Sequence, residues 1–203
     1  MKKLFFLLSV FLFSLSSYVW ATPVYFATDL SNSSVSLGGT TSSSWFLGSG
    51  TLDATLASSL ETTTFTLNDG QSQSFDFFEF DVDAWGIVGG DFTVEATLAF
   101  SSPDGADVTG GGSGVWGSAF GLVSGGFLTW VDMPRTFTLL DGNELTISFD
   151  EGIYVSPGSS VMIQATVTNN GEAPAPVPEP ATMLLLGSGL TGLALYRRKK
   201  SKV

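Results

Sequence analysis

Residues 92–100 read FTVEATLAF, a stretch in which apolar side chains occupy every second position. Successive side chains of a β-strand point to opposite faces, so this alternation predicts a strand with one buried and one solvated face. Residues 145–150 and 161–167 alternate in the same way, and the Asn169-Asn170-Gly171 run is expected to end the last strand. No stretch between residues 22 and 171 keeps a helical period over ten residues. The pattern predicts an all-β body, an antiparallel β-sandwich.

Residues 75–85 (FDFFEFDVDAW) depart from a single alternation. The apolar side chains lie at odd positions up to Phe77 and at even positions from Phe78 onward. A change of parity moves the buried side chains to the other face of a strand unless an extra residue is inserted. The sequence therefore predicts either a β-bulge at Phe77 and Phe78 or a strand buried on both faces.

Two similar hexapeptides, residues 65–70 (FTLNDG) and 137–142 (FTLLDG), end in Asp-Gly. Asp-Gly favours tight β-hairpin turns, so each predicts a hairpin. The favoured interpretation is that two separate hairpins use the same Asp-Gly turn. The alternative is that half of the sandwich is duplicated. The glycine-rich residues 104–126 lack the Gly-Lys-Ser/Thr of a phosphate-binding loop and are expected to form a long flexible loop. The strands and turns together are typical of immunoglobulin-like or jelly-roll-like sandwiches.

The charges of the 203-residue chain, net −11, are unevenly placed. Between residues 22 and 177, Arg135 is the single basic residue against eighteen acidic ones, a net charge of −17. Such a body repels the phosphates of nucleic acids, which excludes a nucleic-acid partner. Arg135 is expected to pair with a carboxylate such as Asp132. The chain has no cysteine and no histidine, which excludes disulfides, Cys/His zinc sites, and mechanisms that need a histidine base or a cysteine nucleophile.

The N-terminus has the three parts of a secretory signal peptide, assigned to residues 1–21. Lys2 and Lys3 precede an apolar run at residues 4–15, and Val19-Trp20-Ala21 fits a cleavage site. The apolar run is shorter than the roughly 20 residues of a spanning helix, which disfavours an uncleaved anchor. We expect export by the translocon and cleavage by signal peptidase between Ala21 and Thr22, which leaves residues 22–171 as the β-sandwich domain.

The C-terminus combines a proline-rich linker with an apolar and then a basic segment. Residues 172–180 (EAPAPVPEP) hold four prolines, which favours a semi-rigid extended linker. Residues 181–196 carry no charge and precede Arg197, Arg198, Lys199 and Lys200. Basic residues stay on the cytoplasmic side, so residues 181–203 are expected to form a short transmembrane helix with a cytoplasmic tail and to leave the body outside.

In this order, Val177, Pro178, Glu179 and Pro180, the short apolar segment, and the basic cluster of Arg197, Arg198, Lys199 and Lys200 resemble a PEP-CTERM sorting tail. The resemblance covers about 26 residues. It implies recognition by an exosortase, a membrane-embedded protease-like transpeptidase, with processing near the Pro-Glu-Pro motif. It also implies a Gram-negative host that makes exopolysaccharide and biofilm matrix. A plain inner-membrane tail anchor is the alternative.

Carboxylates cluster in one predicted strand and shortly after it: Asp76, Glu79, Asp81, Asp83 and Asp91. Carboxylate oxygens are ligands that Ca²⁺ prefers, so these residues are candidate calcium ligands. The same spacing is expected of a solvated strand face, which is the favoured interpretation. No other cofactor is expected.

Four tryptophans of the body offer flat rings on which sugars could stack: Trp45, Trp85, Trp116 and Trp130. Aromatic side chains of a cysteine-free sandwich more often belong to its core, and that interpretation is favoured here. Loss of polysaccharide binding in Trp116→Ala or Trp130→Ala would favour stacking.

The function expected from these features is that of a non-catalytic surface or extracellular-matrix protein. Its body would lie in the periplasm on an inner-membrane-anchored intermediate and then reach the cell surface or the biofilm matrix. A carbohydrate-binding module for exopolysaccharide, with or without Ca²⁺, is the first alternative. A secreted hydrolase that uses a carboxylate pair is the second, but no pair is marked by its surroundings and no catalytic residue is expected.

Overall fold

A computed structural model describes residues 23–45, 47–119, 123–151, 159–172, 184 and 187–192. The chain divides into two compact units, Met1–Gly171 and Glu172–Val203. The described part of the first unit consists almost entirely of β-strands joined by short turns. In chain order its elements are β1 (Val24–Thr28), β2 (Ser34–Gly39), β3 (Ser42–Trp45), β4 (Gly48–Leu56), the 3₁₀ helix η1 (Ser58–Glu61), β5 (Thr64–Leu67), β6 (Ser72–Leu98), β7 (Phe100–Ser102), β8 (Val108–Ala119), β9 (Val123–Trp130), β10 (Arg135–Thr138), β11 (Asn143–Phe149) and β12 (Ser159–Glu172).

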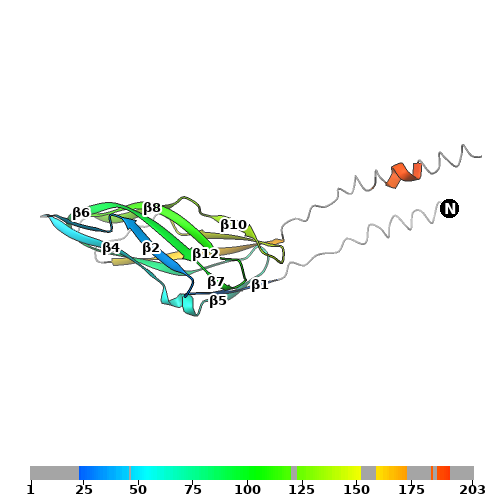
Figure 1. The fold of residues 1–203 in the computed structure, drawn as a ribbon, viewed down its shortest axis with the longest axis horizontal. Coiled ribbons are helices and arrows are strands. Elements are labelled where there is room, and N and C mark those ends of the chain that lie inside the picture. The colour runs from blue at the N-terminus through cyan, green and yellow to red at the C-terminus, as the bar shows by residue number, and fades with distance from the viewer. Residues whose placement is uncertain are drawn as a thin grey trace, which may run out of the picture. The chain divides into compact units, whose positions relative to one another are not determined.

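The strands form two layers that share β6, and a small third sheet packs against them (Figure 1). The first layer has the order β10-β11-β12-β6-β4-β3, and the second has the order β2-β6-β8-β9. The third sheet has the order β5-β1-β7, and its Phe65 ring lies 5.5 Å from that of Phe75 in β6. All recorded pairings are antiparallel. The prediction of an all-β antiparallel sandwich is confirmed.

Strand β6 belongs to both layers because it folds back on itself near its middle. Its first half pairs with β12 and β4, and its second half pairs with β2 and β8. The rings of Phe80 and Phe92, twelve residues apart in the strand, lie 5.7 Å from each other. A straight strand would separate them by about 40 Å. Gly86, midway between them, has a φ of +75°, and it marks the place where the strand reverses.

One core fills the space between the layers. From Phe78 to Leu98 the even-numbered side chains of β6 face inward almost without interruption, while the odd-numbered ones face solvent. The register with β12 shifts between Ile163, opposite Phe78, and Gln164, opposite Asp76, so Phe77 is the extra residue of a bulge. Both Phe77 and Phe78 are fully buried. Of the two alternatives predicted from the change of parity, the bulge is the one confirmed.

The prediction of a long flexible loop at residues 104–126 is wrong, because β8 and β9 occupy most of this segment. Inward-facing glycines of β8 make room for large aromatic rings from other strands. A Cβ atom at Gly110 would lie 3.0 Å from the ring of Phe149, and one at Gly112 would lie 3.0 Å from the ring of Trp130. The glycines therefore serve packing, and their number in the sequence does not signal flexibility.

The two Asp-Gly turns differ in their roles. The turn at Asp141 and Gly142 joins β10 and β11, which pair as the predicted hairpin. The turn at Asp69 and Gly70 instead connects β5 of the third sheet to β6, so the hairpin predicted there is wrong. The difference arises because β5 finds its partner in β1, where Leu67 lies opposite Val24.

The prediction that the Asn169-Asn170-Gly171 run ends the last strand is also wrong, since β12 continues through this run to Glu172. Asn169 is fully buried, and its backbone carbonyl accepts a hydrogen bond from the Gly70 amide at 2.8 Å. Its side-chain amide donates to the carbonyl of Leu67, which itself lies opposite Val24. These contacts place the start of β1 and the end of β12 at the same end of the first unit (Figure 1).

Apart from Glu172, the last residue of β12, the second unit is described only at Leu184 and at residues 187–192, which are helical. Within the described residues, no helix has both the length and the apolar character needed to cross a membrane. The predicted signal peptide at residues 1–21 and the cleavage site at Ala21 and Thr22 lie outside the described residues. So do residues 173–180 of the linker and most of the predicted transmembrane segment and basic tail, residues 181–203.

Candidate functional site

The structure does not gather the candidate calcium ligands into one site. Glu79, Asp81 and Asp83 follow one another along the solvent-facing side of β6, while Asp91 lies in the half of the strand that belongs to the second layer. Asp76 lies before the bulge and accepts a hydrogen bond from a side-chain amide at 3.2 Å. In the described ranges, no three acidic side chains come close enough to hold a metal ion. The arrangement favours the solvated strand face.

Three of the four tryptophans can be placed, and they fall into two classes. Trp116 and Trp130 are buried, and their indole N–H groups donate to backbone carbonyls at 2.6 Å and 3.0 Å. The possibility that these two rings stack on a ligand is therefore wrong, because both belong to the core. Trp85 is 64% exposed on the outer side of β6. The side chain of Trp45 lies outside the described part of the chain.

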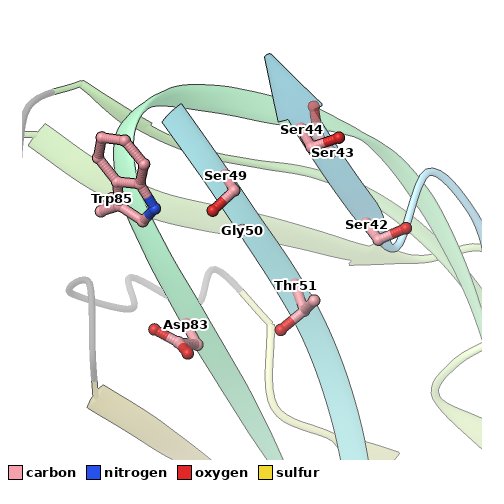
Figure 2. Close-up of a pocket in the computed structure, with 8 residues that line it drawn as sticks. All are labelled: Ser42, Ser43, Ser44, Ser49, Gly50, Thr51, Asp83 and Trp85. Atoms are coloured by element: carbon pink, nitrogen blue, oxygen red, sulfur yellow. The ribbon is translucent and has the colours of Figure 1, made fainter. Parts of the chain in front are cut away.

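Trp85 lies at the margin of a shallow pocket of about 280 Å³ on the outer side of the first layer (Figure 2). Strand register places six of the eight lining residues in two rows across β3, β4 and β6, with Ser43 and Gly50 between the rows. The first row is Ser42, Thr51 and Asp83, and the second is Ser44, Ser49 and Trp85. We call these six residues the Trp85 pocket. It combines four hydroxyl groups, one carboxylate and one aromatic ring.

The floor of the Trp85 pocket is supported from the core. Gly50 lies between the two rows, and a Cβ atom there would lie 3.1 Å from the ring of Trp116 and 2.9 Å from the Cβ of Ala84. The Trp116 indole N–H donates to the carbonyl of Thr40, at the corner between β2 and β3. Trp116 of the second layer thus positions both β4 and β3, the two strands that carry the hydroxyl groups.

The pocket lies far from the end of the unit where β1 begins and β12 ends. Ser72, at the start of β6, is opposite Thr168 of β12, whereas Trp85 comes thirteen residues later in the same strand. At the rise of a β-strand, this separation is about 40 Å. The pocket therefore lies distant from the point at which the chain leaves the first unit toward residues 173–203.

The lining has the chemistry of a site for polyhydroxyl compounds. Hydroxyl and carboxylate oxygens can exchange hydrogen bonds with ligand hydroxyls, and an exposed indole offers an apolar face to the C–H side of a sugar ring. Among the residues that the structure describes, no basic side chain lines the pocket. Sequence reasoning singled out Trp85 and Asp83 but missed the hydroxyl residues. Only the register of β3 and β4, which no local motif reveals, places those hydroxyls beside the indole.

Arg135, the sole basic residue of the body, does not make the predicted pair. Arg135 and Asp132 are both exposed, and no ion pair joins them in the part of the chain that the structure describes. Arg135 opens β10, where it lies opposite Ile147.

Comparison with known proteins identifies the C-terminal segment. The family model described as the PEP-CTERM protein-sorting motif matches residues 176–200. The match includes the Val177-Pro178-Glu179-Pro180 motif and the basic residues from Arg197 to Lys200, so the resemblance noted from the sequence is confirmed. No curated protein and no solved structure matches the chain. The chain carries a PEP-CTERM sorting signal and is an exported substrate of exosortase.

Proposed function

Because the chain carries a PEP-CTERM sorting motif, we propose that its body is a non-catalytic component of the cell surface or extracellular matrix of a Gram-negative bacterium. Signal peptidase would cleave after Ala21, and the apolar segment at residues 181–196 would hold the intermediate in the inner membrane with the body in the periplasm. Exosortase would then process the chain near Pro178-Glu179-Pro180 and release the body to the surface or the biofilm matrix.

The observation that carries this proposal is the match at residues 176–200. The test is fractionation of native-host cultures that express the full chain or its Glu179→Ala variant. The wild-type body is expected in the matrix fraction of the exosortase-positive strain and in the membrane fraction of an exosortase-deletion strain. The Glu179→Ala chain is expected in the membrane fraction of both. Wild-type body that reaches the matrix equally in both strains would contradict sorting by exosortase.

A second, more specific function is favoured by the Trp85 pocket: binding of a matrix polysaccharide. Trp85 is 64% exposed although burial of an indole would be favourable, and hydroxyl groups surround it. The body's charge of −17 further restricts the ligand, because polyanionic polymers would be repelled. The site therefore suits a neutral or amine-bearing polysaccharide. A carboxylate-based hydrolase would instead release reducing ends from the same polymer.

The binding test uses mature protein from the native host and the neutral and acidic fractions of that host's extracellular polysaccharide. Wild-type protein is expected to bind the neutral fraction, with and without a chelator, and to release no reducing ends. Trp85→Ala is expected to weaken binding about tenfold, which corresponds to about 1.4 kcal/mol. Tyr25→Ala removes a ring that is 52% exposed on β1 and is the matched control. Equal binding by wild type and Trp85→Ala would contradict a role for the pocket.

A further inference from the structure

A second depression of about 560 Å³ lies on the outer side of the second layer, across β2, β6 and β8. Strand register again brings the outward side chains into rows. Ser36 lies opposite Glu95, and Glu95 lies opposite Gly111. In the next row, Gly38 lies opposite Thr93, and Thr93 lies opposite Ser113. Val131 and Asp132, which follow β9, complete the lining. We call this depression the β2–β8 trough.

Two glycines create the trough by leaving its floor without side chains. A Cβ atom at Gly38 would lie 2.6 Å from the hydroxyl oxygen of Thr93 and would cover it. A Cβ atom at Gly111 would meet only the Oδ2 atom of Asp132, at 4.0 Å. The space above Gly111 is therefore open and bordered by polar groups. Gly111 itself lies in an ordinary strand, where a β-branched residue would be favoured if packing alone decided.

The trough repeats the chemistry of the Trp85 pocket with different residues. Ser36, Thr93 and Ser113 supply hydroxyl groups, and Glu95 and Asp132 supply carboxylates. Val131 is 76% exposed and provides an apolar wall, the role that the indole has in the Trp85 pocket. Within the described part of the chain, no basic side chain lines the trough. The same class of ligand, a neutral or amine-bearing polyhydroxyl chain, fits both places.

The fold-back of β6 places these two sites on opposite sides of the sandwich. Asp83 and Trp85 in its first half and Thr93 and Glu95 in its second half are all odd-numbered and solvent-facing. The two halves belong to different layers whose even-numbered side chains share one core. The odd-numbered side chains of the two layers must therefore point away from each other. A polymer chain lying on one site cannot lie on the other without wrapping around the sandwich.

We infer that the β2–β8 trough is a second polysaccharide-binding site and that the body joins two polymer chains, one on each side. This inference rests on the proposed polysaccharide binding at the Trp85 pocket. A protein with two outward-facing sites can hold two polymer chains at the same time. Many such proteins along the same chains join them into a cross-linked network, even where each single contact is weak. The two sites give the exported body a structural role in the matrix.

The test compares binding with bridging. Beads coated with the host's neutral polysaccharide carry either of two fluorescent dyes, and mature protein is added to the mixture. Gly111→Thr fills the trough, Trp85→Ala removes the platform of the other site, and a third protein combines both changes. Ala119→Thr adds the same kind of bulk to an exposed outward position at the far end of β8 and is the matched control.

Wild type and Ala119→Thr are expected to bind the beads and to aggregate the two colours together. Each single-site variant is expected to bind the beads about tenfold more weakly than wild type and to lose mixed aggregation at least tenfold. The double variant is expected not to bind. Mixed aggregation by Gly111→Thr at the wild-type level would overturn the second site while leaving the proposed binding intact. Absence of any binding by wild type would overturn both.

Discussion

Substitution of Gly86 by alanine tests the fold-back of β6, on which the two-layered arrangement depends. The φ of Gly86 is +75°, in the left-handed region, where a residue with a Cβ atom costs roughly 1–2 kcal/mol. The new Cβ would also overlap the carbonyl oxygen of Leu47 and lie 2.7 Å from the Cα of Gly48. Forcing atoms into such a contact costs roughly 1–3 kcal/mol more. The expected loss in the free energy of unfolding is therefore about 2–5 kcal/mol.

The assay is urea unfolding of the mature protein, followed by tryptophan fluorescence, with Gly70→Ala as the control. Gly70 has nearly the same φ, +73°, but a Cβ atom there would have no neighbour within 4 Å. Gly70→Ala should therefore lose only the backbone cost of about 1–2 kcal/mol. The difference between the two variants isolates the close approach of β4 to β6. Equal losses in both variants would refute the reasoning that the fold-back is packed against the β3–β4 turn.

Three further predictions concern a buried ring at the bulge, the contrast between a buried and an exposed tryptophan, and the loss of stability at low pH. Phe77→Ala should destabilise by about 3–5 kcal/mol, because the ring is fully buried at the bulge, and urea unfolding measures this loss. Trp116→Phe should cost about 1–3 kcal/mol, because a backbone carbonyl loses its indole donor, whereas Trp85→Ala should change the free energy of unfolding by no more than about 0.5 kcal/mol. The pKa of Asp29 is held below its ordinary value, first by the hydrogen bond from the Ser31 side chain. The contribution of the Asp29 carboxylate to stability should therefore be complete above the unfolded-state pKa of about 3.9 and be lost as the pH falls through the lower folded-state pKa. An NMR titration that shows an unshifted pKa for the Asp29 carboxyl would contradict this prediction.

The strands of the body were predictable where apolar and polar side chains alternate along the sequence. The parity change at Phe77 and Phe78 predicted either a bulge or a strand buried on both faces. The register shift against β12 shows that the bulge is what lets both rings enter the same core. The fold-back at Gly86 was not predictable in the same way. The even-numbered residues keep facing inward on both sides of it, so the hydrophobic pattern continues while the direction of the strand reverses.

The glycines of β8 show the main limit of local reasoning. Taken alone, Gly110, Gly112 and their neighbours resemble a flexible loop, since glycine is disfavoured in strands. Their role depends on Trp130, which lies opposite Gly112 in the neighbouring strand β9, and on Phe149 of β11. These two rings occupy the space that the missing side chains leave. Pairing of this kind is set by tertiary packing and has no signal within the segment itself.

The candidate site was predictable only in part for a related reason. The residue type alone does not show whether an indole is exposed or buried. Trp85 lies on the outward face of β6 and Trp116 on the inward face of β8. The serines of β3 become part of the pocket only because β3 pairs with β4, which carries the other hydroxyl groups. The sorting motif was recognisable because its residues lie in one continuous segment of the sequence, so that no tertiary structure is needed to identify it.

The most direct test of the central claim is the mature form of the chain in the native host with and without exosortase. Between Lys3 and Lys199 the sequence has no lysine, so a chain that starts at Thr22 and ends near Pro178–Pro180 carries a single amine, at its N-terminus. A chain that keeps its tail carries three more, at Lys199, Lys200 and Lys202. Intact mass before and after amine labelling should therefore give a one-amine body in the exosortase-positive strain and a four-amine chain in the deletion strain. A four-amine chain in both strains would contradict exosortase sorting and leave the body as an anchored periplasmic domain.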